Sequence, residues 1–317
     1  MAARSPRLTR RSSIAVLAGA LLAAGGAWYW DAATGAHRPA PGGTADAGLD
    51  IQRAGVRRIV SLVPALTETL YAIGAGGLVV GVSSFDRYPP EVAQLPRVGA
   101  LVDPDAERIL TLRPDLVLMY GSQGEARARF ERAGIQVYTY RHGGIEAILD
   151  TIDSLGSLTG RQAQARDVIH QVRARLTALR TRVAGRRRPR TLVVFERTPQ
   201  TLRGTYVSGG AGFLNEMLQT AGGTNVFADV ARESVQPSHE TLIARAPEVI
   251  LEIRADGLLA PEDADTDRQV WNELSTLPAV RNRRVHFLSG EQLVVPGPRL
   301  ADGVEQMARA LHPDAFR

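Results

Sequence analysis

The sequence predicts an α/β protein made of two similar lobes, each with a central parallel sheet, joined by one long rigid helix. Three observations lead to this prediction. Short β-rich runs alternate with segments of helical spacing from residue 57 onward, as is typical of parallel sheets covered by helices. An ordered series of similar motifs occurs twice. A long stretch of helical periodicity at 144–185 separates the two copies.

The first lobe is expected at 57–143. Its expected strands are 57–63, 78–84, 115–120 and 135–140, and its expected helices are 64–76, 103–114 and 125–134. The first helix is followed by glycines, and the second begins with an aspartate, a favourable N-cap residue, and stops at Pro114. These segments form the alternating pattern of a parallel sheet.

The segment at 144–185 is expected to form the interlobe helix. Its apolar residues, among them Ile148, Ile152 and Leu155, recur at spacings of three and four. A break near Gly156 or Gly160 is an open alternative. The second lobe is expected at 186–317, with strands at 190–196, 248–253 and 284–290 and helices at 210–223, 237–247 and 298–313.

The clearest internal repeat pairs "AERILTLRPDLVL" at 106–118 with "HETLIARAPEVIL" at 239–251. In each copy a glutamate, Glu107 or Glu240, precedes a proline by seven residues, and an acid and an apolar run follow. The helix "TETLYAIGAGGLVVGV" likewise corresponds to "FLNEMLQTAGGTNVFAD". Because these matches occur in the same order, they indicate duplication of a structural unit.

Composition excludes several classes of site. Hydrophobic content is 44% and charged content 22%, which is ordinary for a globular protein. All 38 basic residues are arginine, and the densest basic run, 180–190, has no interleaved aromatic residues, so nucleic-acid binding is not expected. The absence of cysteine excludes disulfides, thiolate metal sites, cysteine nucleophiles and a lipoprotein anchor.

The N-terminus predicts export. A basic start, the apolar segment 14–30 and following small residues form the pattern of a signal peptide or an N-terminal membrane anchor at 1–30. Residues 31–56 are rich in Ala, Gly and Pro, as in a flexible linker. We therefore expect a periplasmic protein, with cleavage or retention at the inner membrane left open, as is the choice between the Sec and Tat routes.

The ordered motifs carry a family resemblance. "RIVSLVPALTETLYAIGAGGLVVGVS" and "LPRVGALVDPDAERILTLRPDLVL" resemble the substrate-binding proteins of bacterial ABC importers for cobalamin, ferric siderophores and haem. "GGTNVF", "SHETLIARAPEVIL" and "PGPRLADGVEQMARALHP" look most like the cobalamin branch. The resemblance runs from about residue 57 to the C-terminus. It implies two Rossmann-like lobes of the class III periplasmic binding protein type, a small ligand in the interlobe cleft, and a monomer that delivers it to a permease dimer.

The same resemblance assigns Glu107 and Glu240 to docking, one glutamate per lobe against arginines of the two permease subunits. Electrostatic contacts of this kind favour fast, reversible association. A structural alternative is that each glutamate occupies the first turn of its helix, where the dipole stabilises an acid by ~0.3–1 kcal/mol. A duplicated structural motif would preserve both without any docking role.

The resemblance also implies ligand-binding residues. Phe85 and Tyr120 fall where cobalamin binders carry aromatic side chains, and aromatic rings bury a large area against a flat ligand. Phe85 and Tyr120 could equally be core or loop residues. Candidates from the second lobe are Glu196, Arg197, Tyr206, Gln236, Arg254 and Gly297. Leu101 stands where an aromatic is expected, and 233–238 contains no Trp, so the pocket is expected to be more polar than that of the family.

Three alternatives remain open. Tyr120 and His142 are residue types that hold haem iron, and Arg197 and Arg254 could pair with an anionic ferric siderophore. A membrane-anchored ligand-sensing module is the third. No histidine pair has the spacing of a helical metal site, and no P-loop, G-x-S-x-G or G-x-G-x-x-G motif follows a strand. We therefore expect no resident metal or cofactor and no enzymatic activity.

Overall fold

The computed structural model describes residues 55–100, 103–255 and 267–317, so the predicted signal or anchor at 1–30, nearly all of the linker at 31–56, and Leu101 lie outside the described residues. The chain divides into two units at Ala184. The N-terminal lobe holds the described residues up to Ala184 and also Val295–Glu305. The C-terminal lobe holds Gly185–Val294 and Gln306–Arg317. The segment 186–317 is thus shared between the lobes.

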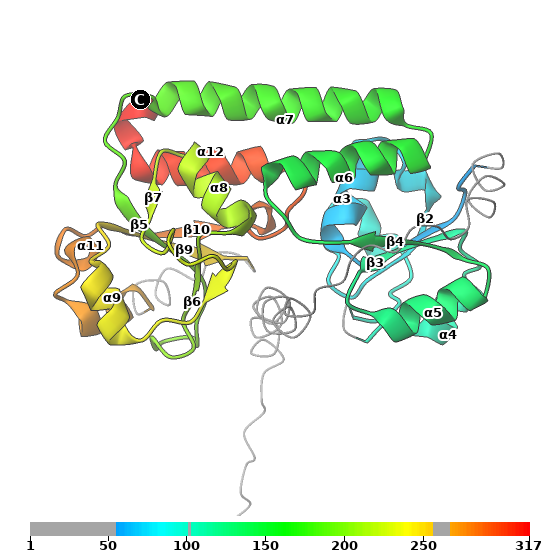
Figure 1. Cartoon of the computed structure of the whole chain (residues 1–317), viewed down its shortest axis with the longest axis horizontal. Helices are drawn as coiled ribbons and strands as arrows, with labels where there is room; N and C mark the ends of the chain where they lie inside the picture. Colours follow the sequence, from blue (N-terminus) through cyan, green and yellow to red (C-terminus); the bar gives the residue numbers. More distant parts are fainter. Residues whose placement is uncertain (1–54, 101–102, 256–266) are drawn as a thin grey trace, which may run out of the picture. The chain divides into compact units, whose positions relative to one another are not determined.

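The N-terminal lobe contains a four-stranded parallel sheet in the order β2-β1-β3-β4 (Figure 1). The strands are β1 (Ile59–Ser61), β2 (Val79–Val82), β3 (Leu116–Tyr120) and β4 (Gln136–Tyr140). Every residue of β1 is buried, as expected for a central strand covered on both faces. The predicted parallel sheet of this lobe is confirmed.

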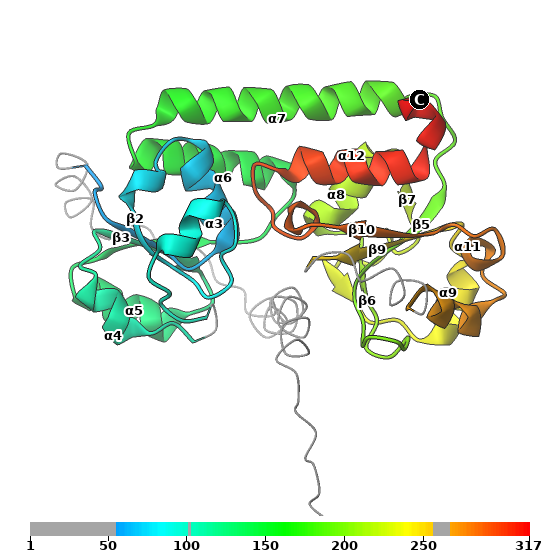
Figure 2. The same cartoon turned by 180° about the vertical axis from the view of Figure 1, so that it is seen from behind.

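Helices cover both faces of this sheet. The first pair, on one face, is α4 (Ala106–Thr111) and α5 (Gly124–Arg132), and the second pair, on the other, is α3 (Pro64–Ala72) and α6 (Ile145–Leu158) (Figures 1 and 2). Ile109 and Phe130 of the first pair pack in one core with Val60, Val117 and Met119 of the sheet. The short helices η1 (Gly76–Leu78) and η2 (Pro90–Gln94) complete the lobe.

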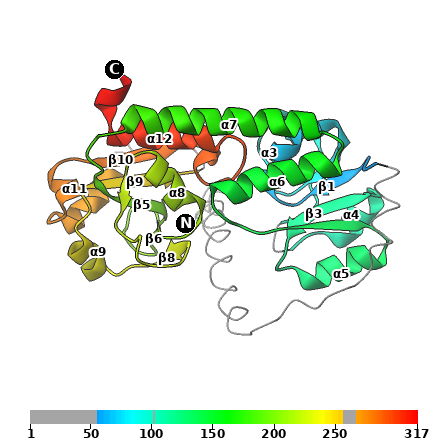
Figure 3. The same cartoon turned by 45° about the horizontal axis from the view of Figure 1, so that its top comes forward.

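The stretch predicted as one interlobe helix forms two helices, α6 and α7 (Gln162–Val183), which lie side by side (Figure 3). Gly160 turns the chain between them at φ 68°, a conformation that glycine adopts without strain. A Cβ on Gly156 would lie 2.4 Å from Cβ of Ala165. The two glycines therefore act together, because one makes the turn and the other lets the helices approach.

The C-terminal lobe contains a six-stranded mixed sheet with the path β10-β9-β5-β6-β8, from which β7 branches at β5. The strands are β5 (Arg190–Glu196), β6 (Tyr206–Ser208), β7 (Thr224–Asn225), β8 (Ser234–Val235), β9 (Val249–Arg254) and β10 (Val285–Ser289). β6 runs antiparallel to β5 and β8. The prediction of a parallel sheet is wrong for this edge, since the short connection after β5 allows a return but not a parallel crossover.

Helices again cover the sheet. They are α8 (Gly212–Thr220), α9 (His239–Arg245), α11 (Pro278–Arg281) and the second half of α12 (Leu300–Leu311), whose first half up to Glu305 belongs to the N-terminal lobe. The short helices are η3 (Val270–Leu274), η4 (Glu291–Leu293) and η5 (Pro313–Phe316). Trp271 is fully buried in one core with Leu192, Val194 and Ile250 of the sheet. This core lies on the face covered by α9 and α11 (Figure 1).

The internal repeat has a matching structure in both lobes. Asp105 caps α4 and Ser238 caps α9, each accepting the backbone N–H three residues later, at 3.0 and 3.3 Å. Each helix ends at a left-handed residue that precedes the proline, Arg113 at φ 46° and Ala246 at φ 43°. Because proline disfavours a helical conformation in the preceding residue, both helices stop before the proline, α4 at Thr111 and α9 at Arg245, within one residue of the same point of the motif.

The acid after each proline then binds the start of the neighbouring strand. Oδ2 of Asp115 accepts the backbone N–H of Arg58 at 2.9 Å, and Oε2 of Glu248 accepts that of Arg190 at 2.9 Å. In return, the guanidinium of Arg58 donates to the carbonyl of Leu112 at 2.7 Å, and that of Arg190 donates to the last carbonyl of α9 at 2.6 Å. We call this arrangement the acid–arginine clamp.

Asp115→Ala and Glu248→Ala are each expected to lower the free energy of unfolding of their own lobe by about 1–3 kcal/mol, because a charged acceptor of a backbone N–H is lost. Urea unfolding followed by far-UV circular dichroism measures the change. Glu107→Ala and Glu240→Ala, on the same two motifs but exposed, are the controls and should change stability by less than about 0.5 kcal/mol. Wild-type stability of both clamp variants would contradict the clamp.

Candidate functional site

The carboxyl ends of the four parallel strands gather candidate residues at one edge of the N-terminal lobe, the edge at which open α/β sheets bind ligands. Phe85 follows β2, Tyr120 ends β3 and His142 follows β4. Phe85 is half-buried, and its backbone N–H donates to Oγ of Ser83 at 3.2 Å. Phe85 and Tyr120, the two residues predicted in this lobe, thus lie at the same sheet edge, with β1 between their strands.

Tyr120, Tyr140 and His142 form an aromatic cluster at this edge. Their ring centroids lie 5.3 Å apart for the two tyrosines, and 5.0 and 5.4 Å from Tyr120 and Tyr140 to His142. The register of β3 and β4 places Tyr120 opposite Tyr140. Burial lowers the pKa of His142 to about 4, so the imidazole is neutral at neutral pH. Tyr140 was not singled out by the sequence, although it ends β4 only two residues before His142.

Asp86 is a second residue at this edge that sequence reasoning missed. Its carboxylate is buried, its Oδ2 accepts from Oγ of Ser83 at 2.5 Å, and its Oδ1 has no hydrogen-bond partner. Burial raises its pKa to about 6, while hydrogen bonds from Ser83 and Thr67 and the charge of Arg97 act in the opposite direction. Arg97 also donates to the backbone carbonyl of Asp86 at 2.6 Å, which holds the loop that carries Phe85.

Gly297 lies in the N-terminal lobe, not in the second lobe where it was expected. It is buried, and a Cβ at this position would lie 3.3 Å from Oε2 of Glu68. Nε of Arg299 donates to that same oxygen at 2.8 Å, and the guanidinium stacks 3.7 Å from the ring centroid of Tyr88. Gly297 therefore makes room for a buried ion pair, which gives it a packing role.

The C-terminal lobe brings Glu196 and Tyr206 together as a pair across β5 and β6. Oε2 of Glu196 is buried without a hydrogen-bond partner, and burial raises the pKa of this carboxyl group. Gln236 follows β8 and is exposed.

A small hollow of this lobe is lined by Phe195, Ala211, Gly212, Phe213, Leu214, Glu233 and Ser234. Burial also raises the pKa of its Glu233.

Arg197 and Arg254 belong to a buried ion network. Nε of Arg197 lies 2.9 Å from Oε1 of Glu252, and its Nη2 lies 2.7 Å from Oδ2 of Asp267. Arg254 pairs with the same two acids. The side chain of Arg197 has no exposed surface, whereas that of Arg254 is 14% exposed. Arg197 therefore positions the network and has no surface left for a ligand, while Arg254 keeps some at the carboxyl end of β9.

Glu107 and Glu240 are both exposed in the first turn of their helices. Glu107 forms an ion pair with Arg129 of α5. The hydroxyl of Ser238 lowers the pKa of Glu240, and Ile243, one turn further along α9, is 46% exposed. The equal spacing from glutamate to proline accompanies a capped helix of similar length in each copy, so the spacing by itself does not demand docking.

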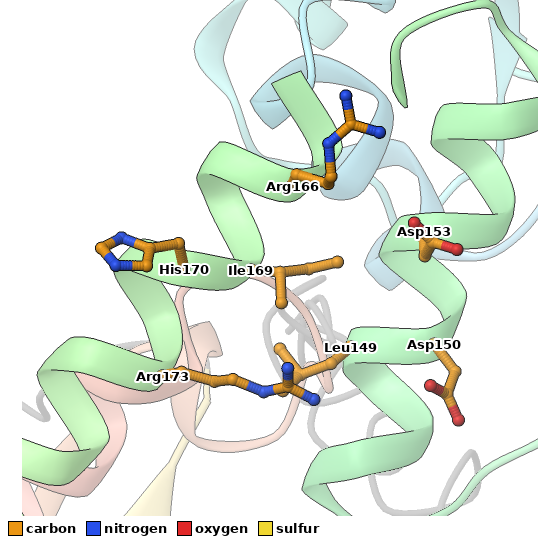
Figure 4. A pocket seen from close by; sticks show the side chains of 7 residues that line it. All are labelled: Leu149, Asp150, Asp153, Arg166, Ile169, His170 and Arg173. Carbon is orange, nitrogen blue, oxygen red and sulfur yellow. The ribbon is translucent and has the colours of Figure 1, made fainter. Parts of the chain in front are cut away.

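A separate groove lies between α6 and α7 (Figure 4). Its volume is about 410 Å³, and its lining residues are Leu149, Asp150, Asp153, Arg166, Ile169, His170 and Arg173. The acids line the α6 side and the basic residues the α7 side, with the apolar side chains between them (Figure 4). None of the predicted ligand residues lines this groove.

Within 55–100, 103–255 and 267–317, no three His, Asp or Glu side chains are grouped so that they could hold a metal ion. Over the same described segments, every helix is too short or too polar to cross a membrane.

Comparison with known proteins identifies the family. A family model described as "Periplasmic binding protein" matches residues 59–291. The chain belongs to this family. It is 31% identical over 257 residues to a vitamin B12-binding protein of Vibrio cholerae, a match that covers 80% of this chain and 88% of the relative. It is also 31% identical to an uncharacterized ABC transporter substrate-binding lipoprotein of Bacillus subtilis, with 82% of each chain covered.

Solved structures of the family share the fold. The periplasmic vitamin B12-binding protein of Vibrio cholerae matches with a TM-score of 0.69 and 29% identity, over 83% of this chain and 98% of that one. A periplasmic heme-binding protein from Roseiflexus matches with a TM-score of 0.69 and 27% identity, over 82% and 100%. The predicted two-lobed α/β fold is thus confirmed, with a parallel sheet in one lobe and a mixed sheet in the other.

Asp86→Asn is expected to stabilise the protein at pH 7.5 by up to about 3 kcal/mol, because each pKa unit corresponds to about 1.4 kcal/mol. The folded pKa of Asp86, about 6, lies above its ordinary value of 3.8. Its contribution to stability is therefore lost as pH rises from 3.8 through 6. Urea unfolding at pH 4 and 7.5 should show the gain only at the higher pH, with the exposed Asp103→Asn as control. An equal gain at both values would contradict the assignment.

Proposed function

We propose that this protein is the substrate-binding component of an ABC importer that captures cobalamin or a related corrinoid and delivers it to a permease dimer in the inner membrane. Membership of the periplasmic binding protein family supports the transport role. Proteins with that role bind a small molecule and release it unchanged, so an enzymatic activity is not proposed. The observation that carries the ligand class is the aromatic cluster at the carboxyl ends of β3 and β4.

The aromatic cluster suits a large, flat ligand. The ring of Tyr140 is buried and supports the partly exposed rings of Tyr120 and His142 at centroid distances of 5.3 and 5.4 Å. These two rings would offer an aromatic surface on which a macrocycle buries apolar area. Phe85, half-buried after β2 at the same sheet edge, would add a further aromatic surface. The vitamin B12-binding relatives support the choice of a corrinoid among such ligands.

Haem is the second candidate, because Tyr120 and His142 lie together. Their ring centroids are 5.0 Å apart, and the imidazole is neutral because burial lowers its pKa to about 4. A neutral imidazole and a tyrosine are both known types of haem-iron ligand. The heme-binding relatives among the solved structures support this alternative.

Docking through Glu107 and Glu240 remains part of the proposal. Both side chains are exposed at equivalent positions of the two repeats, which suits a permease whose two subunits are related by two-fold symmetry. Glu107 would have to exchange its partner Arg129 for an arginine of the permease. Glu240 would dock together with the exposed Ile243.

Titration of the purified protein with cyanocobalamin, haem and a ferric siderophore tests the ligand class. We expect binding of cyanocobalamin, measured by quenching of protein fluorescence or by calorimetry, and weaker binding of the other two. Tyr120→Ala should weaken that binding by about tenfold, because an aromatic contact is lost. Binding of haem alone, with a Soret band that changes in Tyr120→Phe, would favour the second candidate and refute the first.

Glu107→Arg together with Glu240→Arg is expected to abolish uptake of the ligand by cells and to leave its affinity for the purified protein unchanged. Reversal of both charges replaces attraction to permease arginines with repulsion. Glu125→Arg, also exposed in the first turn of a helix, is the matched control and should retain uptake. Normal uptake by the double variant would exclude the docking role.

A further inference from the structure

Besides Oδ1 of Asp86, two polar atoms at the ligand edge of the N-terminal lobe are buried without a hydrogen-bond partner. They are Nδ1 of His142 and Oε1 of Gln123. His142 packs against Tyr120, and the backbone N–H of Gln123 donates to the carbonyl of Tyr120 at 3.4 Å. Native proteins leave few such atoms unsatisfied, and each exception calls for an explanation such as a bound water, an ion or a functional role. Both residues adjoin Tyr120, one through its ring and the other through its backbone, so the ligand of this edge is a candidate partner for their unpartnered atoms.

The chemistry of the two groups restricts what completes them. Burial lowers the pKa of His142 to about 4, so its imidazole is neutral and has one donor and one acceptor nitrogen. The amide oxygen of Gln123 only accepts. A group that faces both must therefore donate to Gln123 and be able to bond with His142. A carboxylate only accepts hydrogen bonds, so its oxygens would be repelled by Oε1 of Gln123, which is also an acceptor.

We propose that Gln123 and His142 are specificity-determining residues that recognise a primary carboxamide on the edge of the ligand. A carboxamide donates from its nitrogen to Gln123 and can bond with either tautomer of His142. This inference rests on the proposed function, since the corrin of cobalamin carries its peripheral side chains as carboxamides whereas haem carries carboxylates. Recognition by these two residues selects an amidated macrocycle over an acidic one.

The test compares two corrinoids of the same ring, dicyanocobinamide with carboxamide side chains and dicyanocobyrinic acid with carboxylate side chains. The full chain is expected to bind the first at least about tenfold more tightly at pH 7.5, because a buried acceptor left unpaired discriminates strongly. Affinities are measured by equilibrium dialysis, with the absorbance of the corrin ring as the readout.

Variants assign this preference to the two residues. Gln123→Leu and His142→Phe should each weaken binding of dicyanocobinamide by about tenfold and reduce the preference, while the phenyl ring keeps the packing of the cluster. Gln123→Glu keeps an acceptor oxygen, so it should retain dicyanocobinamide within about threefold and exclude dicyanocobyrinic acid further. Gln171→Leu, exposed on α7, is the matched control and should bind both corrinoids as the wild type does.

The outcomes separate this inference from the proposed function. Equal affinity for the two corrinoids, or unchanged binding in both Gln123→Leu and His142→Phe, overturns carboxamide recognition and leaves a corrinoid-binding protein. Binding of haem with no binding of either corrinoid overturns the proposed function, and carboxamide recognition with it. Circular dichroism of each variant verifies that lost affinity reflects the site and not the fold.

Discussion

The acid–arginine clamp is the interaction on which both lobes depend, because it sets the start of the central strand pair in each sheet. An acid after the proline binds the backbone of the neighbouring strand, and the arginine there closes the preceding helix. Parallel pairing then extends from this point along β1 and β3, and along β5 and β9. The far ends of β3 and β9 carry Tyr120 and Arg254. Because the clamp fixes where each strand starts, it also fixes the position of these side chains at the other end of the strand.

The two halves of the repeated motif have different roles. The C-terminal half carries the acid of the clamp, whereas the first helical turn keeps Glu107 or Glu240 exposed. Duplication of this motif therefore gives each lobe the same helix, proline and clamp. It also leaves one exposed glutamate at the equivalent position of each lobe. The lobes differ at the carboxyl ends of their strands, where one has an aromatic cluster and the other an ion network that includes Arg254. Divergence is concentrated where a ligand is expected, as is usual for loops at strand ends.

The N-terminal edge also carries an energetic cost. Asp86, Gln123 and His142 each leave a buried polar atom without a partner, and burial shifts the pKa values of Asp86 and His142 away from their ordinary values. Groups in such surroundings destabilise a fold, and they are found where function requires them. A ligand that satisfied these atoms would recover part of that free energy on binding. The unpartnered atoms thus lower the stability of the free protein and favour ligands that can form hydrogen bonds with them.

The sequence by itself determined the strands of the N-terminal lobe, strands β5, β9 and β10 of the C-terminal lobe, the two copies of the motif and the Pro-terminated helices, because periodicity, capping and proline act over a few neighbouring residues. Tertiary structure alone decided the rest. The antiparallel edge at β6 and the return of Val295–Glu305 to the N-terminal lobe depend on contacts between distant segments. Whether Arg197 reaches a ligand or is enclosed by Glu252 and Asp267 depends on burial, which neighbouring residues in the chain do not encode.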